Sequence, residues 1–271
     1  MLAAVNTLRS QGISVHLEYF SNNTESVQAL VAGRCNIGFD SLGDVLTSNE
    51  SGANFKVFGV ETANEFSLVT RKSITSVSQL TGKRYGVYSE TSYDHAMGVY
   101  AADQAKVKPT FIVAGSTTAR APEIVSGQLD ATGLDVATIV ALKQQSPGQF
   151  NILESFQQTI PHFLTNVIFA SSSVLSADAS TVSAFMTALK NQYDNIDVRA
   201  LETIGKKSIS GWDDTDNETV EAYVSQNMWP KTQSSLLSTS NADWTANFYK
   251  TAGQIKSVPD VSTYIDTTYT S

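Results

Sequence analysis

Cysteine is nearly absent from this sequence: Cys35 is the one cysteine among 271 residues. An internal disulfide needs two cysteines and a cysteine metal site needs several, so a single one excludes both. Cys35 stands between Arg34 and Asn36, just before an apolar segment, which predicts a packing residue. The redox state of the protein's compartment therefore stays open.

Basic residues are also few, with 18 Lys and Arg against 26 Asp and Glu, which gives a formal net charge of -8. Nucleic-acid binding needs clustered Lys and Arg that release counterions from phosphates, and docking on anionic lipid needs the same charge. The acidic balance argues against both partners. It leaves an anionic small ligand open, because a pocket can be locally positive on a negative surface.

Long hydrophobic runs are missing as well. None approaches the ~20 apolar residues that span a bilayer. Residues 1–4 lead straight into a helical pattern with no signal peptide before it. Two alternatives stay open: an export signal has been removed, or the protein is cytoplasmic. The hydrophobic fraction of 41% is nonetheless enough for packed cores.

Common catalytic and cofactor motifs are absent too. The three histidines, His16, His95 and His162, form neither H-x-x-x-H nor H-E-x-x-H, so the spacing of a helical metal site is missing. Residues 115–117 are not a nucleophile elbow, and Gly33 with Gly38 is not a dinucleotide fingerprint. We therefore expect no cofactor, no metal and no catalytic residue.

What the sequence does contain is a repeated alternation of strand and helix patterns up to about residue 170. Apolar and polar residues alternate through 13–19, which predicts a half-buried strand. Further strands are expected at 36–39, 55–60, 66–70, 84–88, 110–113, 130–133, 150–154 and 164–170, and helices at 2–11, 24–32, 76–80, 93–106, 119–126 and 136–144. This order predicts an α/β protein with parallel, doubly wound sheets.

The character of the chain changes after residue 171. Helical patterns cover 178–194, 218–227 and 242–255, and the segment 208–216 is polar and loop-like. A helical tail that follows two α/β units predicts that the chain returns to wrap an earlier domain.

Four segments carry a family resemblance through their order and spacing. They are Val27–Gly33 with Asn36–Phe39; Phe66–Val69 followed by Ile74, Val77, Leu80, Gly82-Lys83 and Gly86-Val87; Ile124–Ala131; and Phe248-Tyr249 with Gly253, Ile255, Val261 and Tyr264–Asp266. Together they resemble the nitrate/sulfonate/taurine-type solute-binding family of ABC importers, whose relatives include binders of thiamine-precursor pyrimidines. The resemblance covers nearly the whole chain.

The resemblance implies the type II periplasmic-binding-protein fold, with two doubly wound α/β lobes, two crossing strands and a ligand in the cleft between the lobes. The crossings are expected near 68–72 and 167–171. Lobe I would then hold residues 1–72, lobe II residues 73–168, and residues 169–271 would return to lobe I with the helical tail. Relatives begin with a strand and a ligand-contacting loop, whereas this chain opens on the first helix. We therefore expect the first strand of lobe I to be missing, which exposes neighbouring strand edges.

Candidate ligand-binding residues follow from the position of helix starts. Ligands of open α/β sheets bind beyond the carboxyl ends of the strands, where helix N-termini present free N–H groups. Ser, Thr and Asp are also the preferred N-caps of any helix, so a purely structural role stays open. The candidates at three helix starts are Asp40 and Ser41; Ser89, Thr91, Ser92 and Tyr93; and Thr117 and Thr118.

Further candidates have alternatives of their own. Arg120 can pair with a sulfonate or carboxylate through its planar fork, or form a surface salt bridge. Asp135 can reach the cleft or cap the next helix, Tyr93 can stack on a flat ligand or face solvent, and His162 lies near the second crossing. Asp40 and Asp135 leave room for a cationic or amine-bearing ligand.

The leading functional hypothesis is an extracytoplasmic solute-binding protein of an ABC importer that captures a sulfonate-, nitrate- or pyrimidine-like solute. Its expected partners are the solute and a membrane permease. We expect a monomer, periplasmic or extracellular, and leave open a membrane anchor in a removed N-terminal segment. One alternative is an enzyme of pyrimidine or menaquinone-precursor metabolism on the same fold, although the Cys-rich motif of fungal pyrimidine synthases is absent. Another is a sensing domain of a regulator, which would need a DNA-binding module.

Overall fold

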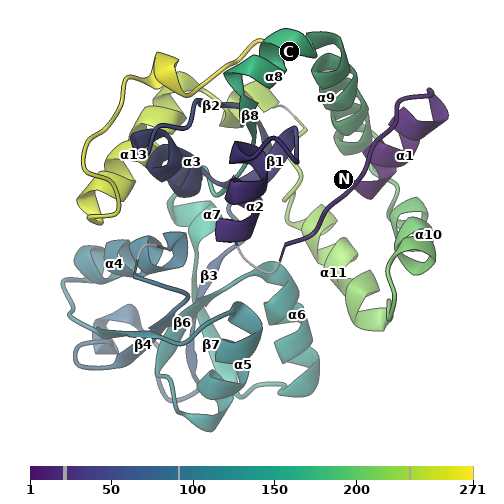
Figure 1. Cartoon of the computed structure of the whole chain (residues 1–271). Helices are drawn as coiled ribbons and strands as arrows, with labels where there is room; N and C mark the ends of the chain where they lie inside the picture. The colour runs from purple at the N-terminus through teal and green to yellow at the C-terminus, as the bar shows by residue number, and fades with distance from the viewer. Residues whose placement is uncertain (21–22, 91, 232, 271) are drawn as a thin grey trace.

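The computed structural model describes residues 1–20, 23–90, 92–231 and 233–270, and these form two α/β units, each built around its own sheet (Figure 1). The strands are β1 Ile37–Ser41, β2 Phe55–Thr62, β3 Ser67–Arg71, β4 Arg84–Val87, β5 Thr110–Val113, β6 Ala131–Leu134, β7 Phe150–Ser155 and β8 Asn166–Ser171. The helices are α1 Leu2–Ser10, α2 Asn23–Val31, α3 Leu42–Glu50, α4 Tyr93–Ala105, α5 Thr117–Ser126, α6 Val136–Gln145, α7 Phe156–Thr159, α8 Ser172–Ala177, α9 Ala179–Asp194, α10 Val198–Ser208, α11 Asp214–Ser225, α12 Gln233–Leu236 and α13 Thr239–Thr251. Short 3-10 turns cover Val77–Gln79 and Val261–Thr263.

The small sheet has the strand order β1-β8-β2, and β8 is antiparallel to both neighbours. Helix α9 supplies an apolar face with Val182, Phe185, Met186 and Leu189 buried, the spacing of an amphipathic helix. This face packs with the buried side chain of Phe58 in β2, and α1 packs along α9. We call this part of the molecule the small-sheet unit.

The large sheet has the strand order β5-β4-β6-β3-β7. Strand β4 is parallel to β5 and β6, whereas β3 is antiparallel to β6 and β7. The prediction of purely parallel sheets was therefore wrong for the strands beside β3 and β8. Both of these strands enter their sheet from the other unit without a crossover helix of their own, and only such a crossover returns a strand in parallel. We call this part the large-sheet unit.

The chain passes between the units through residues 63–66 and 156–165. In the described part of the chain, β3 pairs with β6 and β7, and β8 pairs with β1 and β2. These links lie a few residues before the crossings expected at 68–72 and 167–171, and the boundaries at 72 and 168 stay predictions. The pairing partners that assign each strand to a sheet are distant in sequence, so local patterns do not reveal them.

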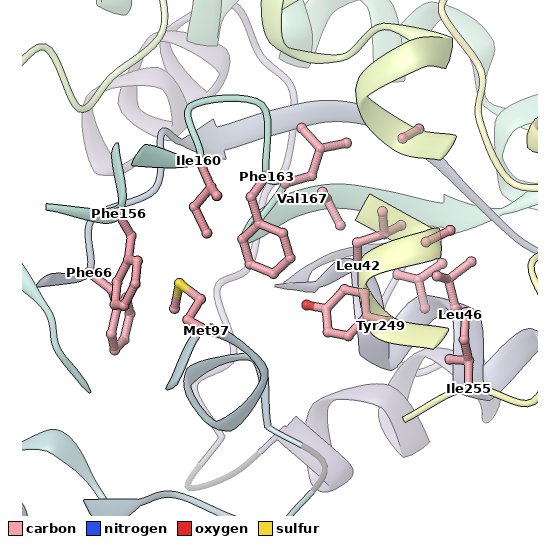
Figure 2. Packing of buried hydrophobic residues seen from close by; sticks show 14 of the residues in the cluster. Leu42, Leu46, Phe66, Met97, Phe156, Ile160, Phe163, Val167, Tyr249 and Ile255 are labelled. Atoms are coloured by element: carbon pink, nitrogen blue, oxygen red, sulfur yellow. The ribbon is translucent and has the colours of Figure 1, made fainter. Parts of the chain in front are cut away.

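One apolar cluster runs through both units (Figure 2). Met97 on α4 lies in the same cluster as Leu42 and Tyr249, which belong to the small-sheet unit. The ring of Phe163, in the second link, lies 5.5 Å from that of Tyr249, and the ring of Tyr100 on α4 lies 5.6 Å from that of Phe248 on α13. Helix α13 thus covers the junction of the units.

The C-terminal helices contact both units. Helix α13 packs on α3 and α4, whereas α11 packs on α6 of the large-sheet unit. Thr215 on α11 donates a hydrogen bond of 2.7 Å to the side-chain oxygen of Gln144 on α6. The tail was predicted to pack on the first unit, and α11 also contacts the second. Helix α10 was not predicted, although Asp197 caps it by accepting from the backbone N–H of Ala200 at 3.1 Å.

The predicted strand at 13–19 is not formed. Ile13, Val15 and Leu17 are half-buried between exposed residues, so the alternation is real, but no described strand pairs with this extended segment. Strand β1 lies at the edge of the small sheet, so in the described structure it pairs with β8 on one side and with no strand on the other. An alternating pattern reports burial on one side, whereas a strand also needs a hydrogen-bonded neighbour.

Candidate functional site

A cavity of about 1150 Å³ opens between the two units. Its polar walls come from the end of β1 in the small-sheet unit and from the starts of α4, α5 and α6 in the large-sheet unit. It continues along α1, the extended segment 14–20 and α9, where the lining side chains include Leu8, Val15 and Phe185. This is the position that the ends of parallel strands predict for a ligand site.

The structure brings most of the predicted site residues to this cavity. Thr91 lies outside the described residues, and Thr118 and His162 do not line the cavity. Those that line it are Asp40, Ser41, Ser89, Ser92, Tyr93, Thr117, Arg120 and Asp135.

Asp40 and Ser41 form the corner that the small-sheet unit contributes. Ser41 caps α3, since its hydroxyl accepts from the backbone N–H of Asp44 at 3.0 Å. Asp40 does not cap the helix: its carboxylate accepts from the Ser26 hydroxyl at 2.7 Å and from the Ser41 N–H at 2.9 Å. Burial, and then the nearby carboxylate of Asp44, raise the pKa of Asp40 to about 7.

The loop between β4 and α4 is held by its own side chains. The Ser92 hydroxyl donates to the carbonyl of Ser89 at 2.7 Å and accepts from the Ser89 N–H at 3.2 Å. Ser92 makes no capping bond to α4. Asp94 takes over that role, because its carboxylate accepts from the N–H groups of His95 and Tyr88, each at 3.0 Å.

Arg120 was expected to meet an anionic ligand or to form a surface salt bridge. Its salt bridge is buried and not on the surface, because the side chain lies 2.7 Å from the Asp94 carboxylate. Arg120 also lines the cavity, and its contact with a ligand stays a prediction. Its guanidinium also donates to the carbonyls of Gly115 at 2.5 Å and Gly133 at 3.0 Å. Arg120 lies one turn after the start of α5, so its long side chain reaches beneath the loops that contain Gly115 and Gly133.

Asp135 fulfils both of its predicted alternatives. It caps α6 by accepting from the Thr138 N–H at 2.7 Å, and it lines the cavity. Its second oxygen accepts from the hydroxyls of Thr117 at 2.6 Å and Thr138 at 3.1 Å. This network joins the start of α5 to the start of α6 and fixes the direction of the carboxylate.

Tyr93 forms an aromatic wall with Phe66, a residue of the first link. Their rings are 5.1 Å apart and nearly perpendicular. Burial, followed by the nearby carboxylates of Glu65 and Asp94, raises the pKa of Tyr93 well above its ordinary value. Tyr93 therefore stays neutral and offers an apolar edge with one polar atom.

Two predicted site residues lie outside the cavity lining, and their ligand contacts stay untested. Thr118 is exposed and its hydroxyl pairs with that of Ser116 at 2.9 Å, on the outer side of the helix start. The ring of His162 stands edge-on to Trp244 of α13, with 4.1 Å between ring centres. The second link turns His162 toward α13, so its position in the chain near a crossing did not place it at the cavity.

Other cavity residues had weaker signals in the sequence. Asp44 stands three residues after Ser41, the spacing of a capping pair, and this could have identified it. Tyr88 follows β4, and Phe66 precedes β3. Ser26 comes from α2, far from any predicted strand end, and only the fold brings it to Asp40.

A second polar cluster lies at the links. Glu65, in the first link, accepts hydrogen bonds from the Tyr223 hydroxyl on α11 and from the side-chain amide of Asn166 at the start of β8, the latter at 2.9 Å. Burial raises the pKa of Glu65 to about 7, the carboxylates of Asp135 and Glu61 add to the rise, and the two donors oppose it.

Within the described residues, no group of three or more His, Cys, Asp or Glu side chains is arranged to hold a metal ion. In the same part of the chain, no helix combines the length and the apolar character needed to cross a bilayer.

Known proteins share this architecture. The structure matches the ligand-binding component of an ABC-type import system from Staphylococcus aureus with a TM-score of 0.80, at 14% identity over 99% of this chain and 92% of the other. It matches the periplasmic aliphatic sulphonate binding protein SsuA from Escherichia coli with a TM-score of 0.76, at 15% identity over 98% and 87%. The Candida albicans CA3427 product, described as having the generic periplasmic binding protein fold, matches with a TM-score of 0.71, at 16% identity over 99% and 94%.

At these identities the matches show the fold alone, which is the type II periplasmic-binding fold. No curated protein sequence matches significantly. The sequence profile of the NMT1/THI5 like family matches residues 8–196, about two thirds of the chain. The chain therefore belongs to the NMT1/THI5 like family.

Proposed function

We propose that this protein is the extracytoplasmic solute-binding component of an ABC importer. It captures a small solute between its two sheet units, closes around it, and delivers it to a membrane permease without changing it chemically. The protein acts as a monomer in the periplasm or outside the cell.

The observation that carries this proposal is the cavity itself. About 1150 Å³ is ample for a small organic molecule, and its polar groups come from both units. A solute that touches Asp40 on one side and the starts of α4 to α6 on the other stabilises the closed arrangement, because those contacts exist together only when the units are close. Binding and closure are then one event.

The two links, 63–66 and 156–165, supply the hinge. We propose lobe I as residues 1–62 with 166–271 and lobe II as residues 67–155, which shifts the boundaries at 72 and 168 to the strands that pair in each sheet. Residues 214–225 in α11 bridge to lobe II through α6. Closure of this molecule therefore moves α11 relative to one of the two lobes.

The experiment is native mass spectrometry of gently purified protein, followed by thermal melting with candidate solutes. Sulfonates, nitrate, aminopyrimidines and amines form the panel. A solute that binds only the folded state raises the melting temperature as RT ln(1 + [L]/Kd), and it should be recovered unchanged. Recovery of a chemically altered product would favour an enzyme on the same fold, and the absence of any bound or stabilising solute would contradict the proposal.

A further inference from the structure

The charges around the cavity are strongly unbalanced. Among the described residues, the lining includes six acidic side chains, against two guanidinium groups, the imidazole of His16 and the first residue, Met1. The acidic residues are Glu18, Asp40, Asp44, Asp94, Asp135 and Asp178, and the guanidinium groups belong to Arg34 and Arg120.

Neither guanidinium is placed to hold an anion between the two units. Arg120 is 1% exposed, its charge is matched by Asp94 at 2.7 Å, and two carbonyls accept from it. Its Nε–H is the one nitrogen without a partner. Arg34 is exposed, on the turn after α2 beside Cys35, and contributes to the small-sheet side alone. An anion in the cavity would therefore face more carboxylates than guanidinium groups.

Two of the carboxylates have no matching charge. Within the described residues no Lys, Arg or His lies at ion-pair distance from Asp40 or Asp135. Their partners include hydroxyl and N–H groups, and the Asp44 carboxyl lies beside Asp40. They come from different units, Asp40 from the end of β1 and Asp135 from the start of α6. Asp40 is only 8% exposed, and a buried carboxylate without a counter-ion is costly.

A cation in the cavity would relieve this cost on both sides. Each carboxylate has about four lone-pair sites and uses two or three of them in the hydrogen bonds above, so acceptor capacity remains. The raised pKa of Asp40 agrees with a carboxylate that lacks a positive neighbour. Tyr93 and Phe66 line the same cavity and supply apolar surface for the rest of the molecule.

We propose that the captured solute is a cation, a small molecule with a protonated amine that binds both Asp40 and Asp135 as the two units close. This inference rests on the proposed solute-binding function. It assigns the cavity a ligand charge opposite to that of the sulphonates named for the Escherichia coli protein of the same fold.

The test compares amines with sulfonates of the same carbon skeleton at pH 8 and fixed ionic strength. The pairs are butylamine with butane-1-sulfonate, benzylamine with phenylmethanesulfonate, and putrescine with butane-1,4-disulfonate. Calorimetry and melting curves should show an amine that binds while its sulfonate partner does not. The solute retained on the purified protein, identified by native mass spectrometry, should carry an amine.

The matched variants are Asp40→Asn, Asp135→Asn and, as a control on the exposed face of α4, Asp103→Asn. Asparagine keeps the shape of the side chain and remains a good N-cap, so melting curves should show folded proteins. Amine affinity should fall by about tenfold or more in each of the first two variants and stay unchanged in the third.

The outcomes separate the two proposals. Tighter binding of a sulfonate, a retained anionic solute, or unchanged amine affinity in both Asp→Asn variants overturns the charge assignment and leaves solute binding standing. No retained solute and no binding by either class contradict solute binding itself, and the charge assignment with it.

Discussion

The guanidinium of Arg120 and the carboxylate of Asp94 lie 2.7 Å apart, with 1% and 3% of the two side chains exposed. Removing one partner of a buried pair leaves the other charge uncompensated. Asp94→Asn should therefore lower the free energy of unfolding by about 3–5 kcal/mol in urea titrations. The stability would be lost at the start of α4 and at the loops whose carbonyls, those of Gly115 and Gly133, accept from Arg120.

The control for this variant is the surface pair Lys190–Asp194, 3.5 Å apart with 42% and 36% exposure. Solvent screens such pairs, so Asp194→Asn should cost about 0–1 kcal/mol. If the two variants differed by less than about 1 kcal/mol, the Arg120–Asp94 pair would not be the structural element described above.

Gly86 on β4 lies under the side chains of Leu129 and Arg120. A Cβ at this position would collide with Leu129 and lie 3.1 Å from Cδ of Arg120. Gly86→Ala should destabilise the fold by about 1–3 kcal/mol, the usual cost of overpacking. Gly133→Ala on β6 is the matched control, because its nearest atoms would be at 3.6 Å, and it should stay within about 1 kcal/mol of the natural protein. Equal melting temperatures for the two variants would contradict this.

His162 packs edge-on against Trp244 and does not line the cavity. His162→Ala should cost about 0.5–1.5 kcal/mol beyond the lost buried area, whereas His162→Phe keeps the ring contact and most of the stability. Neither substitution should change solute affinity by calorimetry. A drop of about tenfold or more in affinity for His162→Phe would return this residue to the binding site.

Sequence patterns predicted those parts of the fold whose signals are local. Strand β5 was expected at 110–113 and is formed at Thr110–Val113, and Asp135 was expected at a helix start and caps α6. Helix α10 also carries a local signal, since Val198, Leu201 and Ile204 recur at helical spacing between charged residues, but it was not predicted.

The remaining features depend on partners far along the chain. Residues 13–19 alternate as a strand does, yet no neighbouring strand pairs with them in the described structure. Arg120 looked available because Asp94, which neutralises it, is 26 residues away in sequence. The sequence could therefore predict which loops reach the cavity, but not which of their side chains are already satisfied within the protein.

Glu65 connects the first link, the start of β8 and α11, and its pKa is raised to about 7 in the folded protein from 4.5 in a free side chain. The folded state therefore binds the proton more tightly than the unfolded chain. This contribution to stability is fully present below about pH 4.5 and is lost as the pH rises through 7. Stability should thus fall between these values and level off above them.

Glu65→Gln keeps a neutral side chain at all pH values, so the fall in melting temperature between pH 5 and pH 8 should be smaller than in the natural protein. Tyr223→Phe removes a donor that favours the ionised carboxylate, so the pKa of Glu65 should rise further and the fall should extend to higher pH. Glu218 is exposed on α11, the helix that carries Tyr223, so Glu218→Gln should leave the pH profile of stability unchanged. The Asp40 carboxyl titrates in the same pH range, so the Asp40→Asn variant shows how much of the pH dependence of stability comes from Asp40. Identical pH profiles for Glu65→Gln and the natural protein would show that the Glu65 carboxyl is not held neutral at the links between the two units.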